Sequence, residues 1–228
     1  MKVEIWADVV CPWCAIGERR FERALAGFEH ADDVEVVWRS FELDPSAVSG
    51  PPRAPGEEPE PDAHLRRLAA KFGTDVEQVR SMVAGVDATA AEEGLVLHQE
   101  LSVPANTAKA HQVLHLARER GVQVQVQALR RLVLAHFAEG EALGDDETLV
   151  RLAAQVGLDA AEVRDVLARD ALLDAVRADE AEAAALGARG VPFFVVDRRY
   201  GVSGAQPAEH LLEVLRRAWS ERVPQPAG

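Results

Sequence analysis

The segment from Ile5 to Cys14 constrains the fold of this chain more than any other. It contains the only two cysteines among the 228 residues, Cys11 and Cys14, at the end of a short apolar run. An amphipathic run follows, so the pattern predicts a strand that ends before Cys11 and a helix that begins there. Pro12 suits the first position of that helix, because its missing N–H would have no intrahelical partner there. Pro12 is therefore expected to shape the site.

The spacing of the two cysteines favours redox chemistry. Residues three apart in a helix lie on the same face, with Cα atoms about 5 Å apart, a separation that a disulfide can bridge. Free N–H groups and the positive end of the helix favour a thiolate at Cys11, which we predict to be the attacking nucleophile. Cys14, one turn deeper, is then the resolving thiol that releases a mixed disulfide.

Two neighbours of the cysteines are candidate site residues. Asp8 is either a buried acid that moves a proton to or from Cys14, or a turn or capping carboxylate. Trp13 either shields the pair and offers an apolar contact to a substrate, or packs into the core. The sequence alone leaves both alternatives open.

Composition and charge narrow the class of protein. At 48% hydrophobic residues the chain can form one large core, or a core domain that carries a second, smaller one. The formal net charge of −13 disfavours binding to nucleic acid or to an anionic membrane. Glu4 and Asp8 interrupt the region where a signal peptide needs apolar residues, and no segment is apolar enough to span a membrane, so we expect a cytoplasmic protein.

Metal binding is the main competing interpretation of two cysteines in a reducing compartment. A closed zinc site needs four ligands, and no second C-x-x-C or nearby C-x-H motif supplies them. His111, His115 and Glu119 have metal-ligand spacing on one helix, but a single helix supplies too few ligands. A partly buried histidine beside a solvated one is the simpler expectation. We therefore predict no metal and no bound cofactor apart from a redox-active disulfide.

The remaining candidates are assigned no role in a site. Arg39 is expected to be solvated or paired, and the acidic runs at 92–93 and 179–180 are expected on solvated helix faces. The isolated histidines are His30, His64, His98, His136 and His210.

The order of elements predicts an α/β protein. Strands at 2–9 and 34–43 flank a helix at 11–28, which makes a right-handed βαβ unit with parallel strands. A strand within 190–196, a hairpin to 200–204 and a helix from 207 to 219 follow near the end of the chain. Pro192 heads that buried strand and is a candidate cis residue. Seven helices are expected in between, at 62–72, 75–93, 105–120, 122–139, 145–156, 160–168 and 172–186.

Three units are expected along the chain. Residues 1–43 and 187–228 form the βαβ and ββα core domain, and residues 62–186 form an all-helical insertion. Residues 44–61 hold six of the twelve prolines, which predicts a solvated loop that is either a connector or a flap over the site.

Four blocks of sequence resemble DsbA-like thiol-disulfide oxidoreductases of the thioredoxin-fold superfamily, most closely the FrnE-like cytoplasmic branch. The blocks occur in the family's order and span nearly the whole chain. They are I-W-A-D-V-V-C-P-W-C-A-I-G, W-R-S-F-E-L-D-P, N-T-A-K-A-H at 106–111, and G-V-P-F-F-V with G-A-Q at 204–206.

This resemblance implies a thioredoxin fold with a large helical insertion and a protein disulfide reductase or isomerase. Cys11 would attack and Cys14 would resolve. Val191 and Pro192 would form the cis-proline loop, where the Val191 backbone binds the substrate as an added strand. The implied partners are thiol- or disulfide-bearing proteins or small thiols, with glutathione a candidate co-substrate and a homodimer left open. Asn106 would either line the cleft or cap a helix.

Two alternatives remain. Kappa-class glutathione transferases and 2-hydroxychromene-2-carboxylate isomerases are also similar in fold, but they use a serine at the position of the first cysteine and bind glutathione. The presence of both Cys11 and Cys14 favours redox chemistry over a glutathione-dependent isomerase or transferase acting on small aromatic molecules. A non-catalytic module that binds a metal or a partner is the other alternative.

Overall fold

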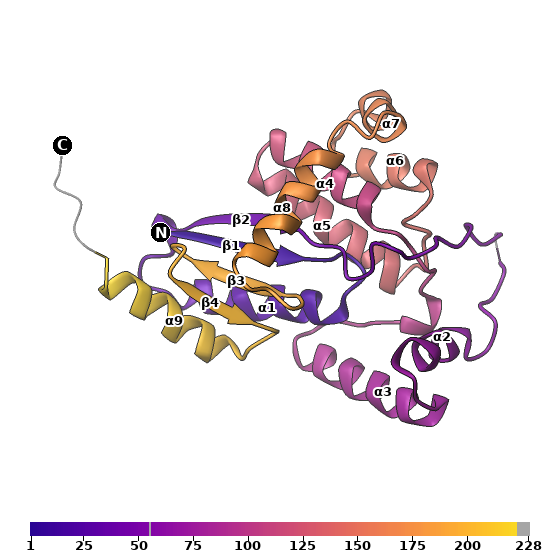
Figure 1. Cartoon of the computed structure of the whole chain (residues 1–228), viewed down its shortest axis with the longest axis horizontal. Helices are drawn as coiled ribbons and strands as arrows, with labels where there is room; N and C mark the ends of the chain where they lie inside the picture. The colour runs from indigo at the N-terminus through magenta and orange to yellow at the C-terminus, as the bar shows by residue number, and fades with distance from the viewer. Residues whose placement is uncertain (55, 223–228) are drawn as a thin grey trace.

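A mixed sheet with the strand order β2-β1-β3-β4 lies at the centre of the molecule (Figure 1). The computed structural model describes residues 1–54 and 56–222. The strands are β1 (Lys2–Ala7), β2 (Glu35–Ser40), β3 (Phe193–Val196) and β4 (Tyr200–Ser203). β1 pairs in parallel with β2 and antiparallel with β3, and β3 and β4 form a hairpin. The predicted βαβ unit and the later hairpin are therefore confirmed.

The side chains of β1 alternate between two apolar layers. Ile5 points to the same side as Phe194, which lies 5.8 Å from the ring of Phe21 on α1 (Pro12–Ala26). Trp6 points to the opposite side, where its ring lies 6.1 Å from that of Phe193. Because β1 is buried on both sides, its sequence is nearly continuous in apolar residues.

Helices cover both faces of the sheet. Figure 1 shows α1 and α9 (Ala208–Ser220) on one side and α8 (Leu173–Ala185) across the other. The indole N–H of Trp6 donates to the carbonyl oxygen of Asp179 on α8 at 2.8 Å, which ties that helix to the sheet.

All seven helices predicted between residues 62 and 186 are present, within three residues of the expected bounds. Besides α8 they are α2 (Ala63–Phe72), α3 (Val76–Glu92), α4 (Ala108–Glu119), α5 (Val122–Phe137), α6 (Asp146–Ala154) and α7 (Ala160–Ala168). Asp75, Asp145 and Asp159 each accept a hydrogen bond from a backbone N–H in the first turn of the next helix. These side chains set the starts of α3, α6 and α7, as Asp at an N-cap does generally. Two short 3₁₀ turns, Ala31–Asp33 and Gln99–Leu101, were not predicted.

The helices form two groups. The main hydrophobic cluster runs from the sheet and α1 into α4, α5, α6 and α7. The pair α2 and α3 has a small cluster of its own, Leu65, Ala69 and Val79, and lies at the lower right of Figure 1. None of the described helices is long and apolar enough to cross a lipid bilayer.

A buried ion network joins α8 to the sheet and corrects one prediction. Asp179 is only 3% exposed, whereas the sequence placed it on a solvated face. Its carboxylate accepts from the Arg39 guanidinium at 2.9 Å and from the Ser40 N–H at 3.0 Å. Arg39 also binds Glu4 at 2.6 Å, so its predicted pairing is confirmed. Burial alone would raise the pKa of Glu4, but hydrogen bonds from Arg198 and Arg39 outweigh burial and lower that pKa.

Glu93 is a second acidic residue whose solvated placement was wrong. Its side chain is 4% exposed and accepts a hydrogen bond from Arg20 on α1 at 2.7 Å, while Arg23 lies 2.7 Å from its other oxygen. The residue therefore joins the end of α3 to α1. From a run of acidic residues in the sequence, one cannot tell which carboxylate pairs with a basic residue of another element. Nor can one tell which carboxylate is buried.

Candidate active site

Both cysteines lie at the start of α1, just beyond the carboxyl end of β1. Cys11 is the N-cap residue with an extended backbone, and Pro12 occupies the first helical position, as predicted. The Cys14 N–H donates to the Cys11 carbonyl oxygen at 3.0 Å. Both cysteines are free thiols, and each is 4% exposed. The local sequence thus holds two thiols on one face of the first helical turn.

A loop from the other end of the chain faces the first cysteine. The Val191–Pro192 peptide bond is cis, as predicted, and the Cys11 Sγ lies 3.8 Å from the Val191 carbonyl oxygen as a donor. The Gly204 N–H donates to the Pro192 carbonyl oxygen at 2.8 Å and holds the loop against the strand β4.

Gly17 shapes this contact, although it was not among the site residues predicted from the sequence. A Cβ at Gly17 would lie 2.7 Å from the Cγ of Pro192, which is closer than side-chain carbons approach. The absence of a side chain therefore lets α1 pack directly on the proline ring. The available signal was an isolated glycine within an amphipathic helix, which often marks a close packing contact.

Asp8 is buried between two elements. One carboxylate oxygen accepts from the Leu43 N–H at 2.8 Å, and the other lies 3.4 Å from the Nε2 of His111. Asp8 is 1% exposed and His111 is fully buried. Among the described residues neither ring nitrogen of His111 has a hydrogen-bond partner. Asp8 is therefore a buried acid, and its carboxylate does not cap a helix.

The sequence predicted that one of His111 and His115 is partly buried and the other solvated. In the structure neither is solvated. His115 Nε2 lies 3.1 Å from a carboxylate oxygen of Asp179, and its side chain is only 13% exposed. Both histidines thus face buried carboxylates, Asp8 and Asp179, from positions one turn apart on the same face of α4. In the described ranges no group of three or more His, Cys, Asp or Glu side chains is arranged to hold a metal ion.

The surroundings of Cys14 keep its sulfur protonated. Burial raises the pKa of the Cys14 thiol well above its usual range, and the neighbouring Cys11 raises it further through a hydrogen bond and its charge. The negative charge of Asp8 acts in the same direction, while a backbone hydrogen bond from Asp8 acts against it. Cys14 is therefore a neutral thiol near neutral pH in the reduced protein.

Cys11 opens on a cavity of about 640 Å³. The residues that line it come from the cysteine segment, the loop after β2, the helices α2 and α3, residues 99–107, and the end of α5. Trp13 lies at this cavity and is 41% exposed, so it does not pack into the core. Val191 also lines the cavity, whereas Cys14 and Pro192 do not.

Four basic side chains line the cavity, and none was assigned to the site from the sequence. They are His64, Arg67, Lys71 and His136. Burial lowers the pKa of His64 to about 4, helped by the charge of Arg67, and burial likewise lowers the pKa of His136 to about 4. Both histidines are therefore uncharged near neutral pH. The sequence signal for His136 was its position beside the apolar residues Leu132, Val133 and Phe137 of the predicted helix.

Asn106 does not line the cavity. Its side-chain oxygen accepts from the Ala108 N–H at 3.1 Å, and its amide group donates to the Pro45 carbonyl oxygen at 3.0 Å. The residue thus serves the start of α4 and fixes the loop after β2, which is the capping role that the sequence left open.

Comparison with known proteins identifies the family. The family model described as "DSBA-like thioredoxin domain" matches residues 2–216. The chain belongs to this family. Its sheet, the helix that carries the two cysteines and the helices between β2 and β3 are the thioredoxin fold with a helical insertion, as the sequence predicted.

Three individual proteins are similar to this chain in sequence or in fold. The crystal structure of the "probable DsbA oxidoreductase SCO1869" from Streptomyces coelicolor is 48% identical, with a TM-score of 0.88, and the match covers 100% of this chain and 94% of that one. The uncharacterized protein YwbO of Bacillus subtilis is 28% identical over 167 residues, which are 72% of this chain and 70% of that protein. The "cytosolic disulfide reductase DsbM from Pseudomonas aeruginosa with GSH" shares the fold, with 19% identity, a TM-score of 0.62 and coverage of 96% and 100%.

Proposed function

We propose that this DsbA-like chain is a thiol-disulfide oxidoreductase in which Cys11 attacks a disulfide and Cys14 resolves the intermediate. The observation that carries the proposal is the placement of Cys11. Its sulfur lies at the amino end of α1 and opens on the cavity, 3.8 Å from the carbonyl oxygen of the cis Val191–Pro192 loop. Cys14 stands one turn behind on the same helix, where a second thiol is needed.

The proposed reaction has two exchange steps. The Cys11 thiolate attacks one sulfur of the substrate disulfide, whose S–S bond breaks and releases a first thiolate. The Cys14 thiol then gives up its proton and attacks the Cys11 sulfur, which releases the second thiol and leaves a Cys11–Cys14 disulfide. Two electrons pass from the protein to the substrate. An external thiol reductant, with glutathione as a candidate, returns the pair to its reduced form.

The position of Asp8 beside Cys14 and His111 supports a role in the second step. Its charge already affects the Cys14 sulfur, and its other contact is to His111 at 3.4 Å. We propose that the Asp8 carboxylate takes the proton that Cys14 must lose, with His111 stabilising the protonated acid. Such a proton acceptor matters here because burial keeps Cys14 protonated.

We propose that the physiological direction is reduction or isomerisation in the cytoplasm. The support is the shared fold with a protein described as a cytosolic disulfide reductase. The direction depends on the potential of the cysteine pair relative to the glutathione pool. Proteins or small molecules that carry disulfides are the proposed partners, and no bound cofactor is required.

Turbidity of insulin under dithiothreitol tests the activity. We expect the wild-type protein to accelerate precipitation, Cys11→Ser to abolish the acceleration, and Cys14→Ser to stall after one exchange. Thermal unfolding of each variant serves as the folding control. Full acceleration by a folded Cys11→Ser variant would refute the proposal. Equilibration of the pair in glutathione buffers, read by alkylation and mass spectrometry, then gives the direction.

A further inference from the structure

The walls of the cavity beside Cys11 are largely apolar. The side chains on α2 and α3 that face it have no large core of their own, since that helix pair buries only a small cluster. Phe72 and Met82 are each 53% exposed and Val48 is 84% exposed. Exposed apolar groups gathered around one hollow are typical of a binding surface. The apolar residues of α2 and α3 that line the cavity are Leu68, Phe72, Val79, Met82, Val83 and Val86, and Val48 lines it from the loop after β2.

Arg67 adds a positive charge to this wall. Its guanidinium donates to the Ser102 carbonyl oxygen at 2.9 Å and lies 3.4 Å from the Nδ1 of His64. Among the described residues it has no carboxylate within 4.0 Å, although the chain has a formal net charge of −13. Arg53, which donates to two backbone carbonyls, adds a second positive charge nearby and lowers the pKa of Arg67 further after burial.

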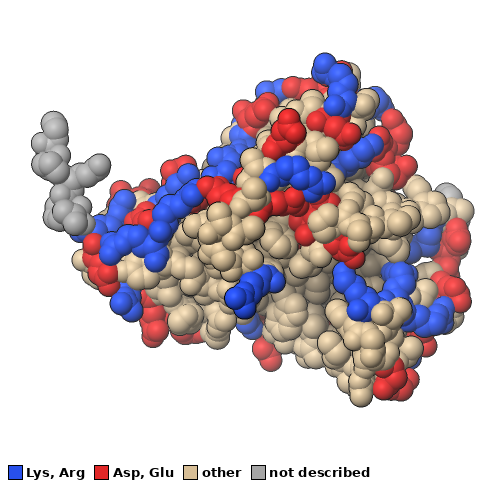
Figure 2. Space-filling view, viewed as in Figure 1, with Lys and Arg blue, Asp and Glu red and all other residues tan. Residues whose placement is uncertain are grey.

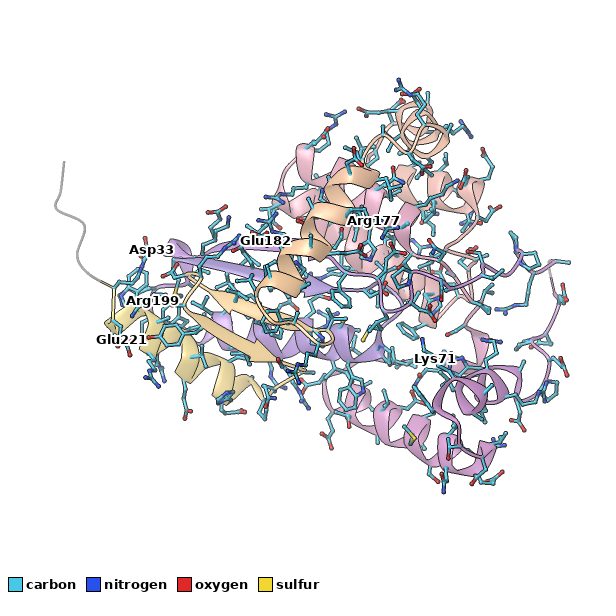
Figure 3. All side chains as sticks on the ribbon, viewed as in Figure 1. Asp33, Lys71, Arg177, Glu182, Arg199 and Glu221 are labelled. Carbon is cyan, nitrogen blue, oxygen red and sulfur yellow. The ribbon has the colours of Figure 1, made fainter. Side chains whose placement is uncertain are left out.

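The neighbouring basic groups do not replace Arg67. Lys71, one turn along α2, is paired with Asp44 at 3.1 Å. Figure 3 labels Lys71 on the side of α2 that is turned toward the rest of the molecule. In Figure 2 the surface is hollowed between the α2–α3 pair and the sheet, and Lys and Arg side chains gather beside that hollow. The charge at this wall is therefore suited to an anion.

We propose that the cavity binds small disulfides that have an apolar body and a carboxylate, with the carboxylate on Arg67 and the reacting sulfur at Cys11. This inference rests on the proposed oxidoreductase activity and names its substrate class. A cavity of about 640 Å³ is within the usual range for small-molecule sites. The guanidinium presents a planar pair of donors that matches a carboxylate.

The chemistry is the exchange already described. The Cys11 thiolate attacks one sulfur of the small disulfide, the S–S bond breaks, and an apolar thiolate carrying the carboxylate leaves. Cys14 then loses its proton, attacks Cys11 and releases the second thiol, so the reduced protein supplies both electrons. Because the carboxylate forms no bond in either step, Arg67 contributes to binding and not to the exchange itself.

Two aryl disulfides, one that carries carboxylates and one that is neutral, test the inference. The full chain is reduced with dithiothreitol, desalted, and mixed with dithiobis-nitrobenzoate, which carries carboxylates, or with neutral dithiodipyridine. Stopped-flow absorbance follows release of the aryl thiol. Arg67→Gln should slow the carboxylated probe about tenfold, since a hydrogen bond to a charged group contributes about 1.5 kcal/mol or more. The half-saturating concentration should rise while the limiting rate stays unchanged. The neutral probe should react at the wild-type rate.

Arg66→Gln is the matched control. Arg66 is the preceding residue on α2, carries the same charge, pairs with Glu60 at 2.7 Å and does not line the cavity. It should leave both probes at the wild-type rate. Arg67→Lys, which keeps the charge but not the planar donors, should recover part of the loss and shows that the effect is not one of folding.

Three results would overturn the inference. The first is that Arg67→Gln slows both probes equally, and the second is that it does not slow the carboxylated probe. The third is that a neutral disulfide-containing peptide reacts faster than the carboxylated probe, at a rate that Arg67→Gln does not change. A binding measurement on a redox-inactive variant distinguishes failure of this inference from failure of the proposed redox function. Calorimetry of Cys11→Ser with naphthoate and naphthamide reports binding alone, and naphthoate should bind about tenfold more tightly through Arg67.

Discussion

At the scale of single residues, Cys11 and Cys14 differ in what surrounds each sulfur atom. Cys11 lines the cavity and faces the Val191 carbonyl oxygen, whereas Cys14 lies behind it with a pKa raised by burial. An attacking sulfur must be reachable by the substrate. A resolving sulfur needs only to reach its partner, so the two positions suit different steps.

This asymmetry predicts a trapped intermediate in Cys14→Ser. With the resolving thiol removed, the Cys11 mixed disulfide should persist, and mass spectrometry after incubation with dithiobis-nitrobenzoate should find one aryl thiol per chain. Wild type should release both thiols and retain none, and Cys11→Ser should retain none. A stable adduct on Cys14 in the Cys11→Ser variant would contradict the assigned order of attack.

Replacing the acid beside the pair should separate the two steps. Asp8→Asn keeps an oxygen for the Leu43 N–H, which now donates at 2.8 Å, but removes the charge that faces His111. We expect the first release of thiol to be unchanged and the second to slow about 10²-fold at neutral pH, as for loss of a general base. Two-phase stopped-flow kinetics measure both steps.

The control for this variant is another carboxylate at the same cavity. Asp44 lines the cavity but is only half-buried, and it is paired with Lys71. Asp44→Asn should leave both phases at the wild-type rate. A second phase that is equally fast in Asp8→Asn and in wild type would show that water or another group takes the proton.

The site residues that could be predicted from the sequence are those whose positions depend on neighbouring residues in the chain. Cys11 and Pro12 are placed by the strand and helix that they join, so their positions could be predicted. His64 and His136 could not be assigned, because what makes them site residues is a cavity assembled from distant segments. Asp179 was misplaced for the same reason, since its partners Arg39 and Ser40 belong to another element.

At the scale of elements, the contact between α1 and the loop at Pro192 positions the site. The contact depends on Gly17, where a Cβ would lie 2.7 Å from the proline ring. Because a ring carbon cannot move aside as a flexible side chain can, an added methyl group must displace the helix or the loop. The distance between Cys11 and Val191 is set across this contact.

Gly17→Ala should therefore destabilise the protein although alanine favours helices. We expect a loss of about 1 to 3 kcal/mol in the free energy of unfolding, the usual cost of overpacking, measured by urea denaturation. Gly85→Ala on α3 is the control, because nothing lies within 4 Å of its added methyl group. That variant should gain up to about 1 kcal/mol from helix propensity. Equal stabilisation by both substitutions would show that the helix and the loop adjust freely.

Element boundaries were predictable where a side chain marks them. Asp75, Asp145 and Asp159 cap helices that begin at the next residue, within one residue of the starts expected from the sequence. The start of α4 was placed three residues early, at Ala105 instead of Ala108. The Asn106 side chain, which bonds the Ala108 N–H, explains the later start.

At the scale of the whole molecule, the cavity is a product of the complete fold. Its lining joins segments from Asp8 to Val191, which no local pattern relates. The cavity also brings basic groups against low-polarity walls, and its histidines stay uncharged for that reason. His136 is 5% exposed, and its Nδ1 has no hydrogen-bond partner among the described residues. A buried ring that resists protonation links the stability of the fold to pH.

His136 should make the protein less stable as the pH falls from 6.5 toward about 4. Burial lowers its pKa to about 4 in the folded chain, so in this range the unfolded chain binds a proton that the folded chain does not. Stability is then fully present above pH 6.5, and about 3 kcal/mol is lost across the window. Urea denaturation at several pH values should show a shallower decline for His136→Leu, and an unchanged decline for His210→Gln, whose residue is exposed. Identical pH profiles for wild type and His136→Leu would mean that the ring is protonated as readily in the folded as in the unfolded chain.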